Sequence, residues 1–218
     1  MIKAMDAERF RRDVAAHQMT VLLDCGVYRH LKFRNAPPNS WNMWFELVTW
    51  PGSLAINGDM GTWTFARIDD MFQFFRSDEL RINCSYWHEK MQSDSRFGGP
   101  AKQFTPEQFE KNVISSLENY DLPESQRADI ILALHERGVL GEDHEATAHQ
   151  ALADFAHGDF TFSDPWEISG HGYAYHFLWC LHAIVWGIQQ YDREKGCRDV
   201  NNPMPSTDWD THGESHAG

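Results

Sequence analysis

LVTWPGSLAINGDMGTWTFARIDDMFQFF, residues 47–75, contains the turn and period signals that predict an antiparallel sheet followed by a helix. Pro51-Gly52 marks a turn, and Asn57-Gly58 is a strong hairpin signal because glycine, and asparagine at lower cost, adopts positive φ. The runs SLAIN and TWTFARI on either side of the second turn have strand character. After residue 67, apolar residues recur at helical spacing in IDDMFQFF. The stretch therefore predicts a hairpin and then a short helix.

Segments on the N-terminal side of this stretch extend the sheet. Residues 5–17 have the period of a short amphipathic helix, and residues 19–26, MTVLLDCG, have strand character. Residues 27–34 alternate between apolar and polar side chains, as a half-buried strand does. Residues 41–50, WNMWFELVTW, are apolar on both faces, which is typical of a central strand covered on both sides. Residues 83–97 show no clear period.

From residue 105 the pattern becomes helical. Thr105-Pro106-Glu107-Gln108 is a capping box with proline in the first turn, and residues 121–124 repeat this kind of start. A third helix is expected over residues 142–158, ending at Gly158. The most apolar helix is expected over residues 173–192. Its buried stripe should consist of Leu181, Ile184, Val185 and Ile188.

These segments together predict an α+β fold. We expect an antiparallel sheet of about five strands flanked by helices, followed by a mainly helical lobe. The expected regions are residues 1–100 for the sheet, 101–195 for helices packed on it, and 196–218 for a flexible tail that lacks any period.

Charge is unevenly distributed along the 218 residues, whose formal net charge is −13. Residues 1–34 carry seven Lys and Arg against four Asp and Glu, whereas residues 103–218 carry six against twenty. This balance disfavours a simple nucleic-acid binder. The 42% of hydrophobic residues disfavours a disordered class.

Compartment is indicated by three features. We expect no secretory leader, because the first residues are charged and lack an apolar run. The longest apolar run, residues 173–188, is shorter than the about 20 residues that a membrane span needs. The four cysteines have no C-x-x-C spacing and are expected to be reduced thiols. We therefore expect a cytoplasmic protein without a membrane segment.

Two groups of residues are candidates for binding a partner. The acidic half offers a field complementary to a protein with a basic surface, through Glu107, Glu110, Glu118, Asp121 and Glu124. Solvated helix faces that keep the protein soluble are the alternative explanation. The second group is the hairpin tip, if Asn57 and Asp59 do more than turn the chain. Turn geometry alone is a sufficient reason for the glycines there.

No catalytic, nucleotide-binding or metal-binding motif occurs, so no catalytic residue, cofactor or metal ligand is assigned. Three alternatives stay open. A metal-dependent hydrolase or nuclease could use dispersed His, Asp and Glu, best represented by His171, His176, Asp164 and Glu167. Cys25 could act as a nucleophile with His30 as its base. One sheet face could bind single-stranded nucleic acid through His30, Lys32, Arg34, Trp44, Trp63 and Arg67.

Three segments carry a resemblance to a known family: DCGVYRHLKFR, WFELVTWPGSLAINGDMGTWTFARIDDMFQFFR and INCSYWHEKM. They resemble a family of uncharacterised proteins encoded by tailed bacteriophages and prophages, specifically over residues 9–92 and more weakly through the helical half. The family has no established activity, so no functional residue carries over. The resemblance implies a small phage-borne accessory protein of the host cytoplasm.

Phage accessory proteins often bind and disable a host protein, including CRISPR and other defence components. The leading hypothesis is therefore a non-enzymatic interaction protein that engages a host or phage protein and inhibits nucleic-acid-processing machinery. The oligomeric state is left open, and a homodimer is compatible with the sequence.

Overall fold

The computed structural model describes residues 5–36, 41–95 and 99–201, with side chains up to residue 195. Its largest element is a six-stranded antiparallel sheet in which consecutive strands are neighbours in space. The strands are β1 (His17–Cys25), β2 (Tyr28–Asn35), β3 (Phe45–Trp50), β4 (Ser53–Gly58), β5 (Gly61–Ala66) and β6 (Met91–Ser93). The α+β class and the antiparallel meander are confirmed. The sixth strand comes from the segment that shows no clear period.

The hairpin of the opening stretch is present, but its turn is built differently from the prediction. Asp59 and Met60 join β4 to β5, and Gly58 pairs with Gly61. Gly61 has a φ of +111°, whereas Gly58 does not have a positive φ. A Cβ atom on Gly58 would lie 2.2 Å from the carbonyl oxygen of Trp44. Gly58 is therefore required by the close approach of two backbones and not by a left-handed turn.

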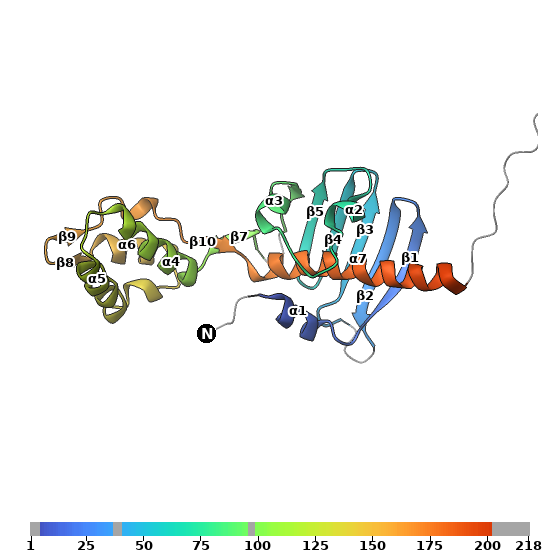
Figure 1. Ribbon diagram of the computed structural model, residues 1–218, viewed down its shortest axis with the longest axis horizontal. Helices are drawn as coiled ribbons and strands as arrows, with labels where there is room; N and C mark the ends of the chain where they lie inside the picture. The colour runs from blue at the N-terminus through green and yellow to red at the C-terminus, as the bar shows by residue number, and fades with distance from the viewer. Residues whose placement is uncertain (1–4, 37–40, 96–98, 202–218) are drawn as a thin grey trace, which may run out of the picture.

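The helices around the sheet contribute their buried side chains to a core on one of its faces (Figure 1). These helices are α1 (Ala7–Asp13), α2 (Met71–Phe75), α3 (Cys84–His88) and α7 (Tyr175–Asn201). In β3, Phe45 and Leu47 face this core and are at most 1% exposed, whereas Glu46 and Val48 on the outer face are half-buried. The prediction that residues 41–50 are covered on both sides is therefore wrong.

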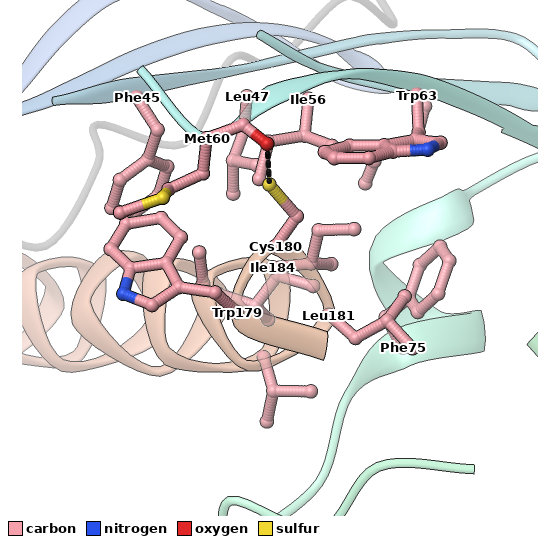
Figure 2. Packing of buried hydrophobic residues seen from close by; sticks show 14 of the residues in the cluster. Phe45, Leu47, Ile56, Met60, Trp63, Phe75, Trp179, Cys180, Leu181 and Ile184 are labelled. Atoms are coloured by element: carbon pink, nitrogen blue, oxygen red, sulfur yellow. Dashed lines mark hydrogen bonds between the residues drawn. The ribbon is translucent and has the colours of Figure 1, made fainter. Parts of the chain in front are cut away.

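α7 forms the centre of this core. The predicted stripe is confirmed, since Leu181, Ile184, Val185 and Ile188 are all 0% exposed. Figure 2 shows Cys180 facing the hairpin, where its thiol donates to the carbonyl oxygen of Met60 at 3.7 Å. A Cβ atom on Gly187 would lie 2.7 Å from Cδ1 of Leu47, so glycine allows the helix to approach the sheet closely.

Residues 105–170 form a second, separate core that we call the lobe. Its elements are α4 (Pro106–Ser116), η1 (Leu117–Asn119), α5 (Glu124–Glu136), η2 (Val139–Gly141), α6 (Glu145–Ala153), β8 (Ala156–His157), β9 (Phe160–Thr161) and η3 (Pro165–Glu167). Phe109, Val113, Leu134 and Leu152 lie at its centre. The expected helix end at Gly158 is wrong, because α6 ends at Ala153 and Gly158, at φ +59°, lies in the turn between β8 and β9.

The lobe is inserted between the sheet and the helix that covers it. Its two ends lie side by side, because β7 (Lys102–Phe104) pairs antiparallel with β10 (His171–Tyr173). Figure 1 shows the lobe at one end of the molecule, joined to the sheet through this short ribbon. The expected arrangement of residues 101–195 as one helical region packed on the sheet is corrected accordingly. We call the sheet with α1, α2, α3 and α7 the body.

The C-terminal part of the chain is helical for longer than expected. α7 continues to Asn201, although a flexible tail was expected from residue 196. The remainder of that expected tail, residues 202–218, lies outside the described residues. Across the described ranges, none of the helices combines the length and apolar character needed to cross a membrane.

Candidate protein-interaction surface

The lobe carries most of the net charge of the chain. Residues 105–170 contain fourteen Asp and Glu but three Lys and Arg, a formal net charge of −11. The rest of the chain contains eighteen Asp and Glu against sixteen Lys and Arg, a formal net charge of −2. The acidic field predicted for the second half of the sequence is therefore concentrated in one unit with its own hydrophobic core.

Local structure directs the candidate carboxylates outward. The Thr105 hydroxyl accepts a hydrogen bond from the backbone N–H of Gln108 at 3.3 Å and caps α4, whose inward face is Phe109 and Val113. Glu107 lies in the first turn, where the helix dipole favours an acid. Glu107 is exposed and Glu110 is half-buried.

The other three candidates lie where α4 passes through η1 into α5. Glu118 and Asp121 are exposed, and Glu124 is exposed in the first turn of α5. Pro123 occupies the N-cap position of α5, and it has no side-chain acceptor for the cap. Asp121 therefore does not cap this helix, contrary to the start pattern in the sequence. These three carboxylates fall within seven consecutive residues.

The lobe carboxylates are not neutralised by lobe cations. Across residues 105–170, all of which the structure describes, both carboxylate ion pairs have a histidine as partner. Nε2 of His135 lies 3.6 Å from Glu110, and Nδ1 of His171 lies 3.4 Å from Glu145. The guanidinium of Arg137 instead donates to the carbonyl oxygen of Ala156 at 2.8 Å. The negative field of the lobe is thus left available to a partner.

Asn57 and Asp59 lie in the body, apart from the acidic residues of the lobe, and both take part in local structure. Oδ1 of Asn57 accepts a hydrogen bond from the Thr62 hydroxyl at 2.8 Å. Oδ2 of Asp59 accepts one from the backbone N–H of Met43 at 2.9 Å, and Met43 has a φ of +55°. Such a backbone needs support from its surroundings. The contacts give both polar side chains of the tip a structural role.

The residues that best represented a metal site do not meet. His171 pairs with Glu145, while His176 lies in α7 with its ring against Tyr175 at 5.7 Å between centroids. Within the described ranges, no three His, Cys, Asp or Glu side chains come together in a group that could hold a metal ion. The alternative of a metal-dependent hydrolase therefore has no assembled ligand set among these residues.

The Cys25 and His30 pair is not assembled either. Cys25 is exposed at the end of β1, where it pairs with Tyr28. Nε2 of His30 instead lies 3.0 Å from Oε2 of Glu46. Cys180 is buried, and burial raises the pKa of its thiol well above the ordinary value. A thiolate nucleophile is therefore not supported at either cysteine.

The proposed nucleic-acid face is not assembled as predicted. Trp63 is 0% exposed on the core side of the sheet, so its expected place on the outer face is wrong. Lys32 donates to Glu46 at 2.8 Å. Partial burial would raise the pKa of Glu46, but hydrogen bonds from Lys32 and His30 outweigh this and lower it. Glu46 is therefore charged at neutral pH and offsets the charge of its neighbours.

Sequence reasoning missed one surface of the body. Leu22 and Leu23 in β1 are 53% and 49% exposed, although both belong to a strand. The signal was present, since two successive leucines interrupt the alternation that a half-buried strand requires. The pairing of β1 with β2 accordingly shifts between Val21 and Leu23, as at a β-bulge.

Comparisons with known proteins do not narrow the choice of function. Neither a protein-family model, nor a curated protein, nor a solved structure matches the chain.

Proposed function

We propose that this chain is a non-enzymatic, phage-encoded interaction protein that binds a host or phage protein with a basic surface. The binding surface is the acidic exterior of the lobe, represented by Glu107, Glu110, Glu118, Asp121 and Glu124. The observation that carries the proposal is the formal net charge of −11 on residues 105–170, without a carboxylate pair to lysine or arginine there.

The negative charge of the lobe indicates which class of partner it binds. Exposed carboxylates attract a positively charged surface over about one Debye length, roughly 8 Å at physiological salt. They repel the phosphate backbone of nucleic acid, so a basic protein is the fitting partner. Proteins that process nucleic acid carry basic surfaces for their substrate. An acidic lobe bound there competes with that substrate, which is how the protein inhibits the host machinery.

The cellular setting comes from the resemblance over residues 9–92 to phage and prophage proteins. It supports a role in the host cytoplasm during infection, with nucleic-acid-processing or defence machinery as the target. The body then serves as the scaffold that holds the lobe. Its sheet core and the ribbon formed by β7 and β10 keep the acidic surface extended from the body.

The experiment is capture of the partner from an infected host lysate, followed by association kinetics with the purified partner. Reversing Glu107, Glu110, Glu118 and Glu124 to lysine together should slow association by about tenfold or more, because charge steering acts mainly on the association rate. Added salt should slow the wild-type chain in the same way. Circular dichroism should be unchanged, since three of the four carboxylates are exposed, Glu110 is only half-buried, and surface charges contribute little to stability.

A control variant separates position from net charge. Reversing Asp69, Asp78, Glu79 and Glu89, four exposed carboxylates of the body, changes the charge by the same amount. This variant should associate close to the wild-type rate. Equal effects of the two variants, or an association rate insensitive to both reversals and salt, would exclude the lobe as the binding surface.

A further inference from the structure

The two edges of the six-stranded sheet differ greatly in length. One edge is β6, with three residues, and the other is β1, with nine. An edge strand presents unpaired backbone N–H and C=O groups that can pair with another chain. A very short edge strand is one of the ways in which proteins prevent this pairing. β6 is protected in this way and β1 is not.

The part of β1 before the bulge, His17–Val21, also lacks the residues that usually protect an edge. The whole strand, HQMTVLLDC, contains no proline, lysine or arginine. Its one carboxylate, Asp24, is held on the core side, where it accepts from the Tyr191 hydroxyl at 2.8 Å and lies 3.2 Å from Nζ of Lys195. β1 therefore carries no unpaired carboxylate or ammonium group that pairing with a second strand would have to bury.

The bulge in β1 protects the end of the strand from pairing and places an apolar surface there. A β-bulge bends a strand and increases its twist, so regular pairing on the free side is confined to His17–Val21. Five residues are about the usual strand length. Beyond this segment, Leu22 and Leu23 are about half exposed.

Two aromatic side chains share the outer face with these leucines. Leu23 pairs with His30, and His30 pairs with Val48. Side chains two residues apart on a strand lie on the same face, which places Tyr28 beside His30 and Trp50 beside Val48. Tyr28 is 50% and Trp50 is 37% exposed. We call Leu22, Leu23, Tyr28 and Trp50 the corner patch.

We infer that the free edge of β1 and the corner patch form the two-fold interface of a homodimer. A strand can pair antiparallel with a copy of itself about a two-fold axis, so one edge supplies both sides of the contact. Two corner patches then meet next to this axis and remove their apolar side chains from water. Exposed apolar surface of this kind marks an interaction site.

Charge favours a second copy of the chain, and not the basic partner of the lobe, as the protein that covers the corner patch. A basic protein finds no free carboxylate on the corner patch, whereas an identical apolar patch needs none. The lobe lies at the end of the body away from β1 (Figure 1), so the two acidic lobes stay far apart in such a dimer. The inference does not depend on the function proposed for the lobe. If the lobe binds a partner and the chain also dimerises, the dimer presents two acidic surfaces.

Sedimentation equilibrium of the full chain tests the inference. The wild-type chain should show a reversible dimer of about twice 25.3 kDa. Replacing Leu22 and Leu23 together by lysine should raise the dimer dissociation constant by about tenfold or more, since each 1.4 kcal/mol is a factor of ten. Leu132→Lys is the matched control, because Leu132 is 57% exposed in the lobe. It should leave the dimer unchanged.

A milder variant and a second measurement distinguish a weakened dimer from loss of the fold. Leu22→Ser with Leu23→Thr keeps a strand-compatible surface and should weaken the dimer as well. Hydrogen exchange of the wild-type chain should show amides of residues 17–21 that lose protection on dilution, while the strands within the sheet stay protected. A wild-type chain that remains at 25.3 kDa at its highest soluble concentration overturns the inference, and so does a dimer that is indifferent to both leucine variants.

Discussion

Gly58 lies where the backbone of β4 passes close to Trp44 and Phe45. A Cβ atom there would lie 2.2 Å from the carbonyl oxygen of Trp44 and 2.7 Å from Cα of Phe45. Both are backbone atoms, so the clash cannot be relieved by a side-chain rotation. Gly58→Ala should therefore lower the free energy of unfolding by about 1–3 kcal/mol, as overpacking does. Urea denaturation measures this change.

Gly141→Ala is the control for that experiment. Gly141 does not have a positive φ, and an added Cβ would have no neighbour within 4 Å. Its effect should stay within about 0.5 kcal/mol. If the two variants have the same urea midpoint, the close approach at Gly58 is not what requires glycine.

At the scale of elements, Arg29 joins three parts of the body. Its guanidinium in β2 donates to both carboxylate oxygens of Asp70, at 2.8 and 3.0 Å, and lies 4.6 Å from the ring centroid of Phe72 in α2. It also donates to the hydroxyl of Tyr191 in α7 at 3.4 Å. Asp70 in turn caps α2 by accepting from the backbone N–H of Phe72. One ion pair therefore positions a strand and two helices.

This ion pair predicts how stability depends on pH. Partial burial would raise the pKa of Asp70, but the hydrogen bonds from Arg29 outweigh it and lower the pKa from its usual 3.8. A carboxyl with a lowered pKa in the folded state stabilises the fold above its unfolded pKa, and this stabilisation is lost as the pH falls through the folded value. Asp70→Asn should lower the free energy of unfolding by about 1–3 kcal/mol at neutral pH.

The difference between wild type and Asp70→Asn should shrink as the pH falls below about 4, because the wild-type carboxyl then becomes neutral as well. Asp69→Asn is the control, since Asp69 is exposed next to it in the sequence. Urea titrations across this pH range measure the free energy of unfolding of the wild type and both variants. A difference that stays constant down to the acid limit would show that the charge of Asp70 is not the cause.

At the scale of the whole molecule, the body and the lobe have separate hydrophobic cores. The ends of the lobe are adjacent because Phe104 pairs with His171. Replacing residues 105–170 by Asn-Gly, a two-residue hairpin turn, should therefore leave the body folded. The shortened chain should unfold cooperatively and keep the circular dichroism of the sheet. Insoluble or non-cooperative material would mean that the body needs the lobe in order to fold.

Much of the element order was predictable from the sequence, because turn residues, capping boxes and apolar periods act over a few residues. Asn57-Gly58, the Thr105 capping box and the stripe from Leu181 to Ile188 each identified an element. The bulge at Leu22 and the helix end at Ala153 were missed, since an interrupted period is a weaker signal than a regular one. The acidic residues of the candidate surface were also visible, because charge is a property of composition.

The sequence by itself determined the α+β class, the antiparallel meander, the buried final helix and the acidic character of the second half. Only the tertiary structure decided that the outer face of β3 is half-buried, that residues 105–170 are an insertion with their own core, and that Asn57 and Asp59 support the hairpin. These features depend on contacts between distant residues, such as Arg29 with Tyr191 at a separation of 162 positions. Local patterns do not encode which distant partner removes a side chain from water, and that choice is made when the cores pack.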